Sequence, residues 1–173
     1  MSPAASPRAR EVVDAGRRLL EEEGAGALTM RRLAERLGIR APSLYKHLPD
    51  KAALEAAIIA TGFEEAASAF EAAVDGAGEP LPALAAAYRS FALAHPHLYR
   101  LMNNGPLPRQ HLPPGLEDRT AAPVLRVAGS QARARALWAF AHGMVMLELD
   151  HRFPPDADLD AAWRAGLAAF RPT

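Results

Sequence analysis

The sequence predicts an all-α protein of about nine helices. Apolar residues recur at helical spacing along almost the whole chain, and no segment shows the strict alternation of a strand. Half of the 173 residues are hydrophobic, which is enough for one or two cores of ordinary size. We expect an N-terminal three-helix domain over residues 1–51 and a C-terminal helical domain over residues 52–173, joined by a long helix at about 50–75.

Two N-terminal helices have clear start and stop signals. Ser6 followed by proline begins the first helix, which buries an apolar stripe that includes Val12 and Leu19 before Gly24 ends it. The second helix begins at Thr29, a residue whose hydroxyl can accept a free backbone N–H. Gly38 is placed to end it in a left-handed turn, which leaves a helix of about nine residues.

The third helix is predicted to be very short. It carries Pro42 in its first turn, where the missing N–H does no harm, and Pro49 ends it. Asp50 then caps the long linking helix, which closes at Gly76 and Gly78.

The second half of the chain contains five more predicted helices. They cover about 82–94, a short segment with Leu98 and Met102, 116–127 with Pro123 inside, 130–151, and a last helix with an apolar stripe from Leu159 to Phe170. Residues 103–115 hold four prolines and two glycines, so this segment is predicted to be a loop.

Composition excludes several classes of protein. The chain has no cysteine, which rules out disulfides, thiolate zinc sites and a cysteine nucleophile. The N-terminus lacks an apolar run behind its positive charges, and no apolar stretch approaches the ~18 residues of a membrane span. We therefore expect a cytoplasmic protein without a membrane partner.

Charge is distributed unevenly along the chain. Residues 29–51 have a net charge of +4, whereas residues 52–80 contain six acidic residues and no Lys or Arg. This asymmetry indicates that one end faces a polyanion and the following element does not. Two solvated helix faces remain the alternative explanation.

The short third helix has a residue pattern that fits a helix-turn-helix. Two short helices joined by a tight glycine turn, with a second helix too small to be a core element, have this layout. Leu44 and Leu48 are expected to dock the helix, while its polar and cationic face enters a major groove of DNA. The N-terminus of the second helix at Thr29, and Lys51 beyond the third, are placed to meet phosphates.

The stretch "LTMRRLAERLGIRAPSLYKHLPDKAAL", residues 28–54, strongly resembles the DNA-binding domain of the TetR family of bacterial repressors. That family has a G-[VI]-x-x-x-[ST]-[LI]-Y-x-[HY] run followed by a lysine. The residues that fall on the pattern are Gly38, Ile39, Ser43, Leu44, Tyr45, His47 and Lys51.

The resemblance implies a role for each predicted DNA contact. Residues at the positions of Arg31, Arg40 and Lys46 reach base edges or nearby phosphates. Ala41 and Pro42 suit apolar contact with a thymine methyl. The remaining predicted contacts bind phosphates and fix register: Thr29, Ser43, Tyr45, His47 and Lys51. For each residue, a solvated surface position is the alternative.

The resemblance also implies a homodimer on a palindromic operator. The last two predicted helices form the expected interface, because two copies of them would make a four-helix bundle. The predicted interface residues are Leu137, Met144, Leu159, Trp163, Leu167 and Phe170. The alternative is that Trp163 and Phe170 pack within one subunit.

The segment "LWAFAHGMVML" resembles the Trp-x-x-x-His-Gly signature of one class of TetR-family C-terminal domains. Such domains hold a small effector in a helix-lined pocket. The candidate lining residues combine apolar bulk with a few polar tips: Tyr88, Phe91, Met102, Trp138, His142 and Met146. The alternative is that they are core residues.

The function that follows from these patterns is ligand-responsive regulation of transcription, with repression as the family's common mode. A helical adaptor that uses the helix-turn-helix for protein contacts is the alternative. An enzyme is not expected, because the chain has no phosphate-binding glycine loop, nucleophile elbow or metalloprotease signature. His142, Glu148 and His151 lack the spacing of a zinc helix, so we expect neither a metal nor a cofactor.

Overall fold

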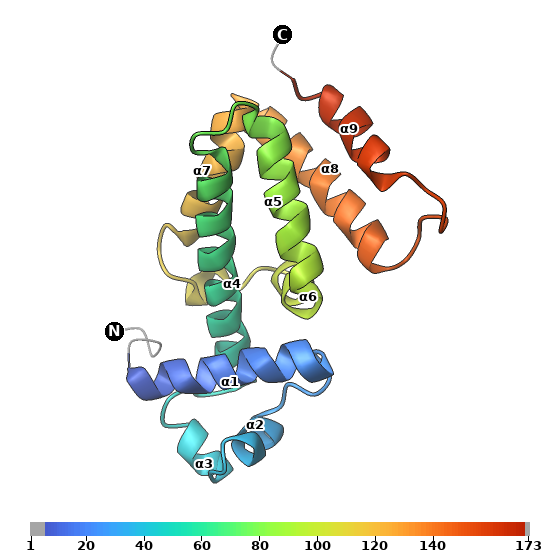
Figure 1. The fold of residues 1–173 in the computed structure, drawn as a ribbon. Coiled ribbons are helices and arrows are strands. Elements are labelled where there is room, and N and C mark those ends of the chain that lie inside the picture. Colours follow the sequence, from blue (N-terminus) through green and yellow to red (C-terminus); the bar gives the residue numbers. More distant parts are fainter. Residues whose placement is uncertain (1–5, 172–173) are drawn as a thin grey trace. The chain divides into compact units, whose positions relative to one another are not determined.

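The computed structural model describes residues 6–171, and this part of the chain is helical without strands, as predicted (Figure 1). The chain forms two compact units. The first contains the chain up to Phe63 together with His95–Leu116, and the second contains Glu64–Ala94 and the chain from Glu117 onward. Each unit is described separately below.

The first unit begins with two capped helices. Helix α1 spans Pro7–Glu23, and the Ser6 hydroxyl accepts the Ala9 N–H at 3.1 Å. Helix α2 spans Met30–Arg36, and the Thr29 hydroxyl accepts the Arg32 N–H at 3.2 Å. These are the two caps that the sequence predicts. Helix α2 packs against both α1 and helix α3, which spans Ala41–Leu44.

Helix α2 is shorter than the predicted nine residues, because its end tightens before Gly38. The Gly38 N–H bonds to the Glu35 carbonyl at 3.1 Å, and the Ile39 N–H bonds to the Ala34 carbonyl at 3.0 Å. Gly38 has φ +64°, the left-handed conformation expected there.

Helix α3 spans only Ala41–Leu44, four residues, rather than the whole predicted segment up to Pro49. The chain continues as a turn, in which the N–H groups of His47 and Leu48 both bond to the Leu44 carbonyl. Pro49 disfavours helical conformation only at Leu48, the residue directly before it, so it limits how far the turn can continue and does not account for the end of α3 at Leu44.

Helix α4 spans Lys51–Val74 and is capped by Asp50, whose carboxylate accepts the Ala53 N–H at 2.8 Å. Its first part lies in the first unit, where it packs closely against helix α6, Pro96–Asn103. A Cβ added to Gly62 of α4 would lie 2.6 Å from the Met102 sulfur and 3.2 Å from Leu98. Glycine therefore permits this close approach of the two helices.

The second unit consists of the rest of α4 with helices α5 (Pro80–Ala94), α7 (Leu116–Ala128), α8 (Gln131–Leu149) and α9 (Leu159–Ala168), of which only Leu116 falls in the first unit. Helix α5 packs on α8, as Figure 1 shows, and it also contacts α9. It begins two residues earlier than predicted, because a proline is also tolerated at the first helical position.

The proline-rich segment is a loop, as predicted, with a short 3₁₀ helix at Arg109–His111. The two compact units do not follow the domain boundary that was predicted after residue 51. Helix α6 and this loop belong to the same unit as the N-terminal helices. Within residues 6–171, no helix has both the length and the apolar character that a membrane span requires.

Candidate nucleic-acid interface and effector region

The segment that contains α3 and the turn after it, residues 41–48, is held by two leucines and otherwise faces solvent. Leu44 is 0% and Leu48 is 2% exposed, whereas the Tyr45 side chain between them is 50% exposed. We call residues 41–48 the reading segment. Burial of the two leucines therefore fixes a short polar surface in place without burying its functional groups.

The predicted DNA-contacting residues surround this segment in the first unit. Those that are exposed are Thr29, Arg31, Arg40, Pro42, Tyr45, Lys46 and Lys51. Ala41, Ser43 and His47 are half-buried. Because Tyr45 and Lys46 follow α3 directly, the reading segment presents them from a turn rather than from a helix.

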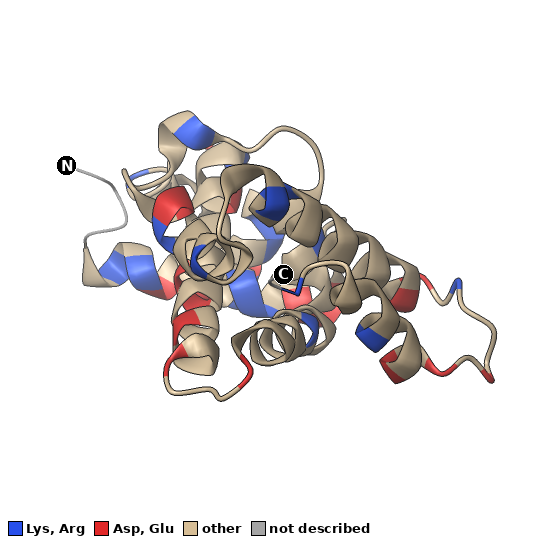
Figure 2. Cartoon of the chain, turned by 90° about the horizontal axis from the view of Figure 1, so that it is seen from above, with Lys and Arg blue, Asp and Glu red and all other residues tan. Residues whose placement is uncertain are grey.

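Some basic side chains of this region form ion pairs within the protein, and others do not. Lysines and arginines are spread over several helices (Figure 2). Arg31 pairs with Glu35 at 3.8 Å, and Lys51 pairs with Glu55 at 3.2 Å. Within residues 6–171, the side chains of Arg40 and Lys46 form no ion pair or hydrogen bond.

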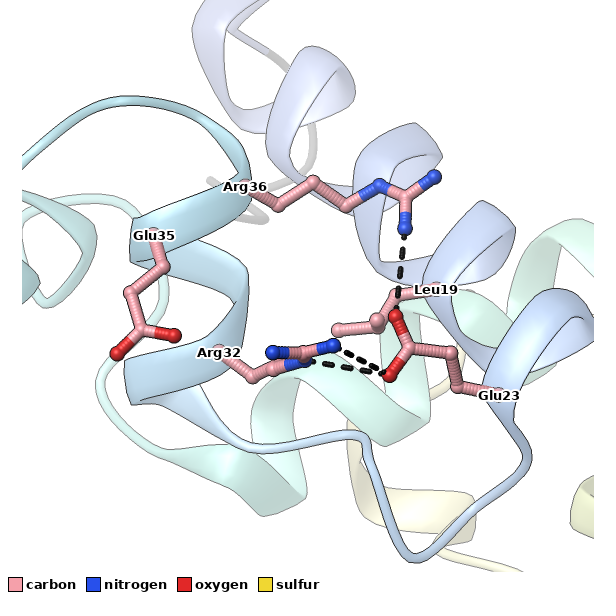
Figure 3. Close-up of a pocket in the computed structure, with 5 residues that line it drawn as sticks. All are labelled: Leu19, Glu23, Arg32, Glu35 and Arg36. Atoms are coloured by element: carbon pink, nitrogen blue, oxygen red, sulfur yellow. Dashed lines mark hydrogen bonds and ion pairs between the residues drawn. The ribbon is translucent and has the colours of Figure 1, made fainter.

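Arg32 and Arg36 of α2 are bound to acidic residues of α1. The Arg32 guanidinium donates to one Glu23 oxygen at 2.8 and 3.2 Å, and Arg36 pairs with Glu23 at 3.7 Å (Figure 3). Arg36 also pairs with Glu22. The +4 charge of residues 29–51 is thus partly neutralised by an acidic run that precedes it. The sequence showed the run, but not that it folds back onto α2.

These ion pairs surround a pocket of about 280 Å³ between α1 and α2. Figure 3 shows Arg32 and Arg36 reaching toward Glu23, whereas Glu35 points away from them. The pocket is lined by Leu19, Glu23, Arg32, Glu35 and Arg36. It does not include any residue predicted to line an effector site.

Of the six predicted effector residues, Met102 lies on α6 in the first unit and the other five lie in the second. Tyr88 and Phe91 are buried and pack on Phe70, with ring centroids 5.6 and 6.4 Å apart. This arrangement matches the core alternative for Phe91. Met146 is half-buried on α8.

Trp138 and His142 lie one turn apart on α8, with ring centroids 6.1 Å apart. Trp138 is 52% exposed, whereas His142 is half-buried. Burial lowers the pKa of His142, because desolvation disfavours the charged imidazole.

Most of the predicted interface residues pack inside this subunit. Leu137, Trp163 and Leu167 are buried, and the Phe140 ring contacts both Trp163 and Phe170, with centroids 5.5 and 6.0 Å apart. Met144, Leu159 and Phe170 are half-buried. Part of the stripe on α9 therefore packs on α8 within the subunit.

A polar network that links α8 and α9 to α5 was not predicted. The Trp163 indole N–H donates to Glu148 at 2.7 Å, and Arg89 donates to Glu148 at 2.9 Å and to Asp160 at 2.6 Å. The hydrogen bond from Arg89 lowers the pKa of Asp160. The signal in the sequence was a charged residue inside an apolar run, Glu148 in "MLEL".

Family models match both parts of the chain. Residues 12–58 match the model described as bacterial regulatory proteins of the tetR family, and residues 81–170 match the tetracyclin repressor-like C-terminal domain. The chain belongs to the TetR family. The helix-turn-helix of this TetR-family chain is therefore the family's DNA-binding motif, as its residue pattern indicated.

Individual relatives agree with this assignment. The chain is 32% identical to the HTH-type transcriptional regulator Rv0681 of Mycobacterium tuberculosis, over 88% of this chain and 74% of that protein. It is 29% identical to the regulator Rv1816 of the same organism, over 69% of this chain. The match covers 52% of Rv1816, so the chain spans about half the length of that relative.

A solved structure shares the fold over almost the whole chain. A protein of unknown function from Rhodococcus sp. RHA1 is 27% identical, with a TM-score of 0.75. The match covers 95% of the TetR-family chain and 94% of that structure.

Proposed function

We propose that the protein binds double-stranded operator DNA as a homodimer and releases it when a small hydrophobic effector binds. The observation that carries the DNA-binding part is the reading segment, in which two buried leucines hold an exposed Tyr45 and Lys46. A core element would bury such residues, whereas a major groove receives them.

A mobility-shift assay with the DNA upstream of the protein's own gene tests this proposal. The retarded band should weaken steeply with rising salt, because phosphate contacts release counterions. Tyr45→Ala should weaken binding by about tenfold or more if the ring packs on the DNA backbone. An adaptor that uses the helix-turn-helix for protein contacts would give no retarded band at any salt.

Two control measurements show whether Tyr45→Ala keeps the fold and the oligomeric state of the parent. The Tyr45 ring is 50% exposed, so its removal should change the melting temperature little. Tyr45→Ala should also keep the parent's mass in light scattering. A variant that binds the operator as tightly as the parent would contradict the assignment of the reading segment.

The proposed dimer is supported by a set of exposed residues around one half of α8, within the part of the second unit that the structure describes. Trp138 and Leu147 are 52% and 42% exposed, and Ala139 is also exposed. Gly143 on this face has no atom within 4 Å of the position of an added Cβ, although a mid-helix glycine costs ~1 kcal/mol relative to alanine. A second copy of α8 that approaches closely would give this glycine a role.

Of the two helices in the predicted interface, we place the centre of the proposed contact on the exposed side of α8. Ala139→Glu should therefore convert the dimer to monomers, because it places a charge at the centre of the face. Ala86→Glu on the exposed side of α5 is the control and should leave the mass unchanged. A dimer that survives Ala139→Glu would place the interface elsewhere.

The proposed effector site lies among α5 and α8, within the part matched by the tetracyclin repressor-like model. The aromatic residues Tyr88 and Phe91 would supply apolar contacts, and His142 a polar tip. An effector that favours a different tilt of α4 would change DNA occupancy, since a typical coupling of ~1–3 kcal/mol alters affinity 5- to 150-fold.

A thermal-shift screen of hydrophobic small molecules tests the effector proposal. A binding compound raises the melting temperature by mass action, and it should also lower operator affinity. His142→Ala should reduce the shift. We further propose that the protein acts in the cytoplasm and has no catalytic activity.

A further inference from the structure

The C-terminal end of α1 carries three consecutive glutamates, which together bind two other helices of the first unit. Glu21 contacts the start of α6, Glu22 pairs with Arg36 of α2, and Glu23 pairs with Arg32 and Arg36. One helix end is thus attached to two helices that are distant in sequence.

The contact with α6 replaces a missing cap. His95, the residue at the start of α6, provides no side-chain hydrogen bond to the helix. Instead, a Glu21 carboxylate oxygen accepts the backbone N–H of Leu98 at 3.3 Å, and His95 Nδ1 lies 3.8 Å from the same oxygen. A carboxylate at this end of a helix is favourable, because the free N–H groups and the helix dipole carry positive charge.

The contact with α2 fixes the first helix of the helix-turn-helix. Arg32 and Arg36 lie one turn apart, so both face the end of α1, and Glu23 contacts both of them. Figure 3 shows this arrangement, in which the two arginines converge on Glu23 from α2. The hydrogen bonds from Arg32 to Glu23 share one oxygen and restrict how α2 can rotate.

We propose that the three glutamates form a joint that couples the position of α6 to the orientation of α2 and the reading segment. The three residues are adjacent on one rigid helix, so a displacement of Leu98 that pulls on Glu21 also moves the carboxylates that hold Arg32 and Arg36. Glu21 is then a positioning residue for DNA reading, although it touches no DNA. The coupling itself does not depend on the proposed function. Only its effect on DNA binding rests on that function.

Helix α6 contacts both α1 and α4, so its movement can affect the reading segment by two routes. Helix α6 is also held by α4 through the close approach at Gly62. Among the described residues, α6 is therefore attached both to α4 by packing and to α1 by hydrogen bonding. A movement of α6 can reach the reading segment along α1 as well as along α4.

The test uses hydrogen exchange on the whole protein without DNA. Glu21→Ala removes the acceptor of the Leu98 N–H, and exchange at the start of α6 should rise about tenfold, the usual effect of one hydrogen bond. The joint predicts that exchange also rises in α2 and in residues 41–48. Glu21→Gln keeps an acceptor oxygen and should retain most of the protection in both places.

Glu11→Ala is the matched control, because Glu11 also lies on α1 and, among residues 6–171, pairs with Arg8 of the same helix and with no residue of α2 or α6. It should leave α2 and α6 unchanged. If Glu21→Ala changes only α6 while α2 and the reading segment keep their protection, no joint exists and the proposal is wrong.

A second measurement separates this inference from the proposed function. Glu21→Ala should weaken operator binding severalfold without changing the salt slope, because the number of phosphate contacts stays the same. If the parent protein binds no DNA, the proposed function fails while the exchange experiment still decides whether the joint exists. If the parent binds DNA and Glu21→Ala binds equally well with the parent's salt slope, the positioning role is wrong.

Discussion

The ring of Phe140 on α8 fills the space into which a Cβ at Gly166 of α9 would project. Glycine at this position allows the two helices to approach closely. The same ring also contacts Trp163 and Phe170, so it occupies the centre of the packing between α8 and α9.

Gly166→Ala should destabilise the second unit, even though alanine is the better helix former. The methyl group must displace an aromatic ring that packs on both sides, and overpacking of this kind typically costs ~1–3 kcal/mol. Chemical denaturation followed by tryptophan fluorescence measures the change, since Trp163 lies in the contact.

A double-mutant cycle shows whether Phe140 is the cause. Phe140→Leu makes room beside residue 166, so the Gly166→Ala penalty should shrink by about half or more in the Phe140→Leu background. Equal penalties in both backgrounds would mean that another contact determines the need for glycine.

Glu148 should be more important for stability than its exposed neighbour Asp160. Its side chain is 5% exposed and accepts from both Trp163 and Arg89, so Glu148→Ala leaves two donors without this acceptor. We expect a loss of ~2–4 kcal/mol in the free energy of unfolding. Asp160→Asn serves as the control and should cost much less, because the Asp160 side chain is 70% exposed.

Local signals in the sequence predicted the helices and their caps. Thr29, Asp50 and Gly38 behave as predicted, because capping and left-handed turns depend on a few neighbouring atoms. The reading segment was also predicted from its two leucines and its prolines. The DNA contacts, effector residues and dimer interface that were assigned to it and to the later helices remain predictions.

Contacts between distant segments were not visible in the sequence. The acidic end of α1 was not recognised as the partner of Arg32 and Arg36, since a charge pattern does not specify which helix folds back on which. In the same way, the stripe from Leu159 to Phe170 has one pattern whether it meets a neighbouring helix or a second subunit. The structure adds that the neighbouring helix covers part of the stripe, since the Phe140 ring packs against Trp163.

His142 should make stability depend on pH. Its pKa is lowered by burial, so the unfolded chain binds a proton more readily than the folded one. The free energy of unfolding should therefore fall as pH decreases below the ordinary histidine value of ~6.5, and it should recover above that value. His142→Gln should flatten this part of the profile, measured by denaturation between about pH 5 and 8. An unchanged profile would assign the dependence to another group.

Basic residues with and without an acidic partner should contribute differently to the salt dependence of DNA binding. Arg40 and Lys46 form no ion pair within residues 6–171, whereas Arg32 donates twice to Glu23. If Arg40 and Lys46 contact phosphates, Arg40→Gln and Lys46→Gln should each reduce the slope of log K against log salt by about 1. Arg32→Gln should leave the slope unchanged, because its guanidinium is already occupied. Mobility shifts at several salt concentrations measure all three. A slope that falls for Arg32→Gln but not for Lys46→Gln would mean that DNA approaches the first unit from the side of α1 rather than from the reading segment.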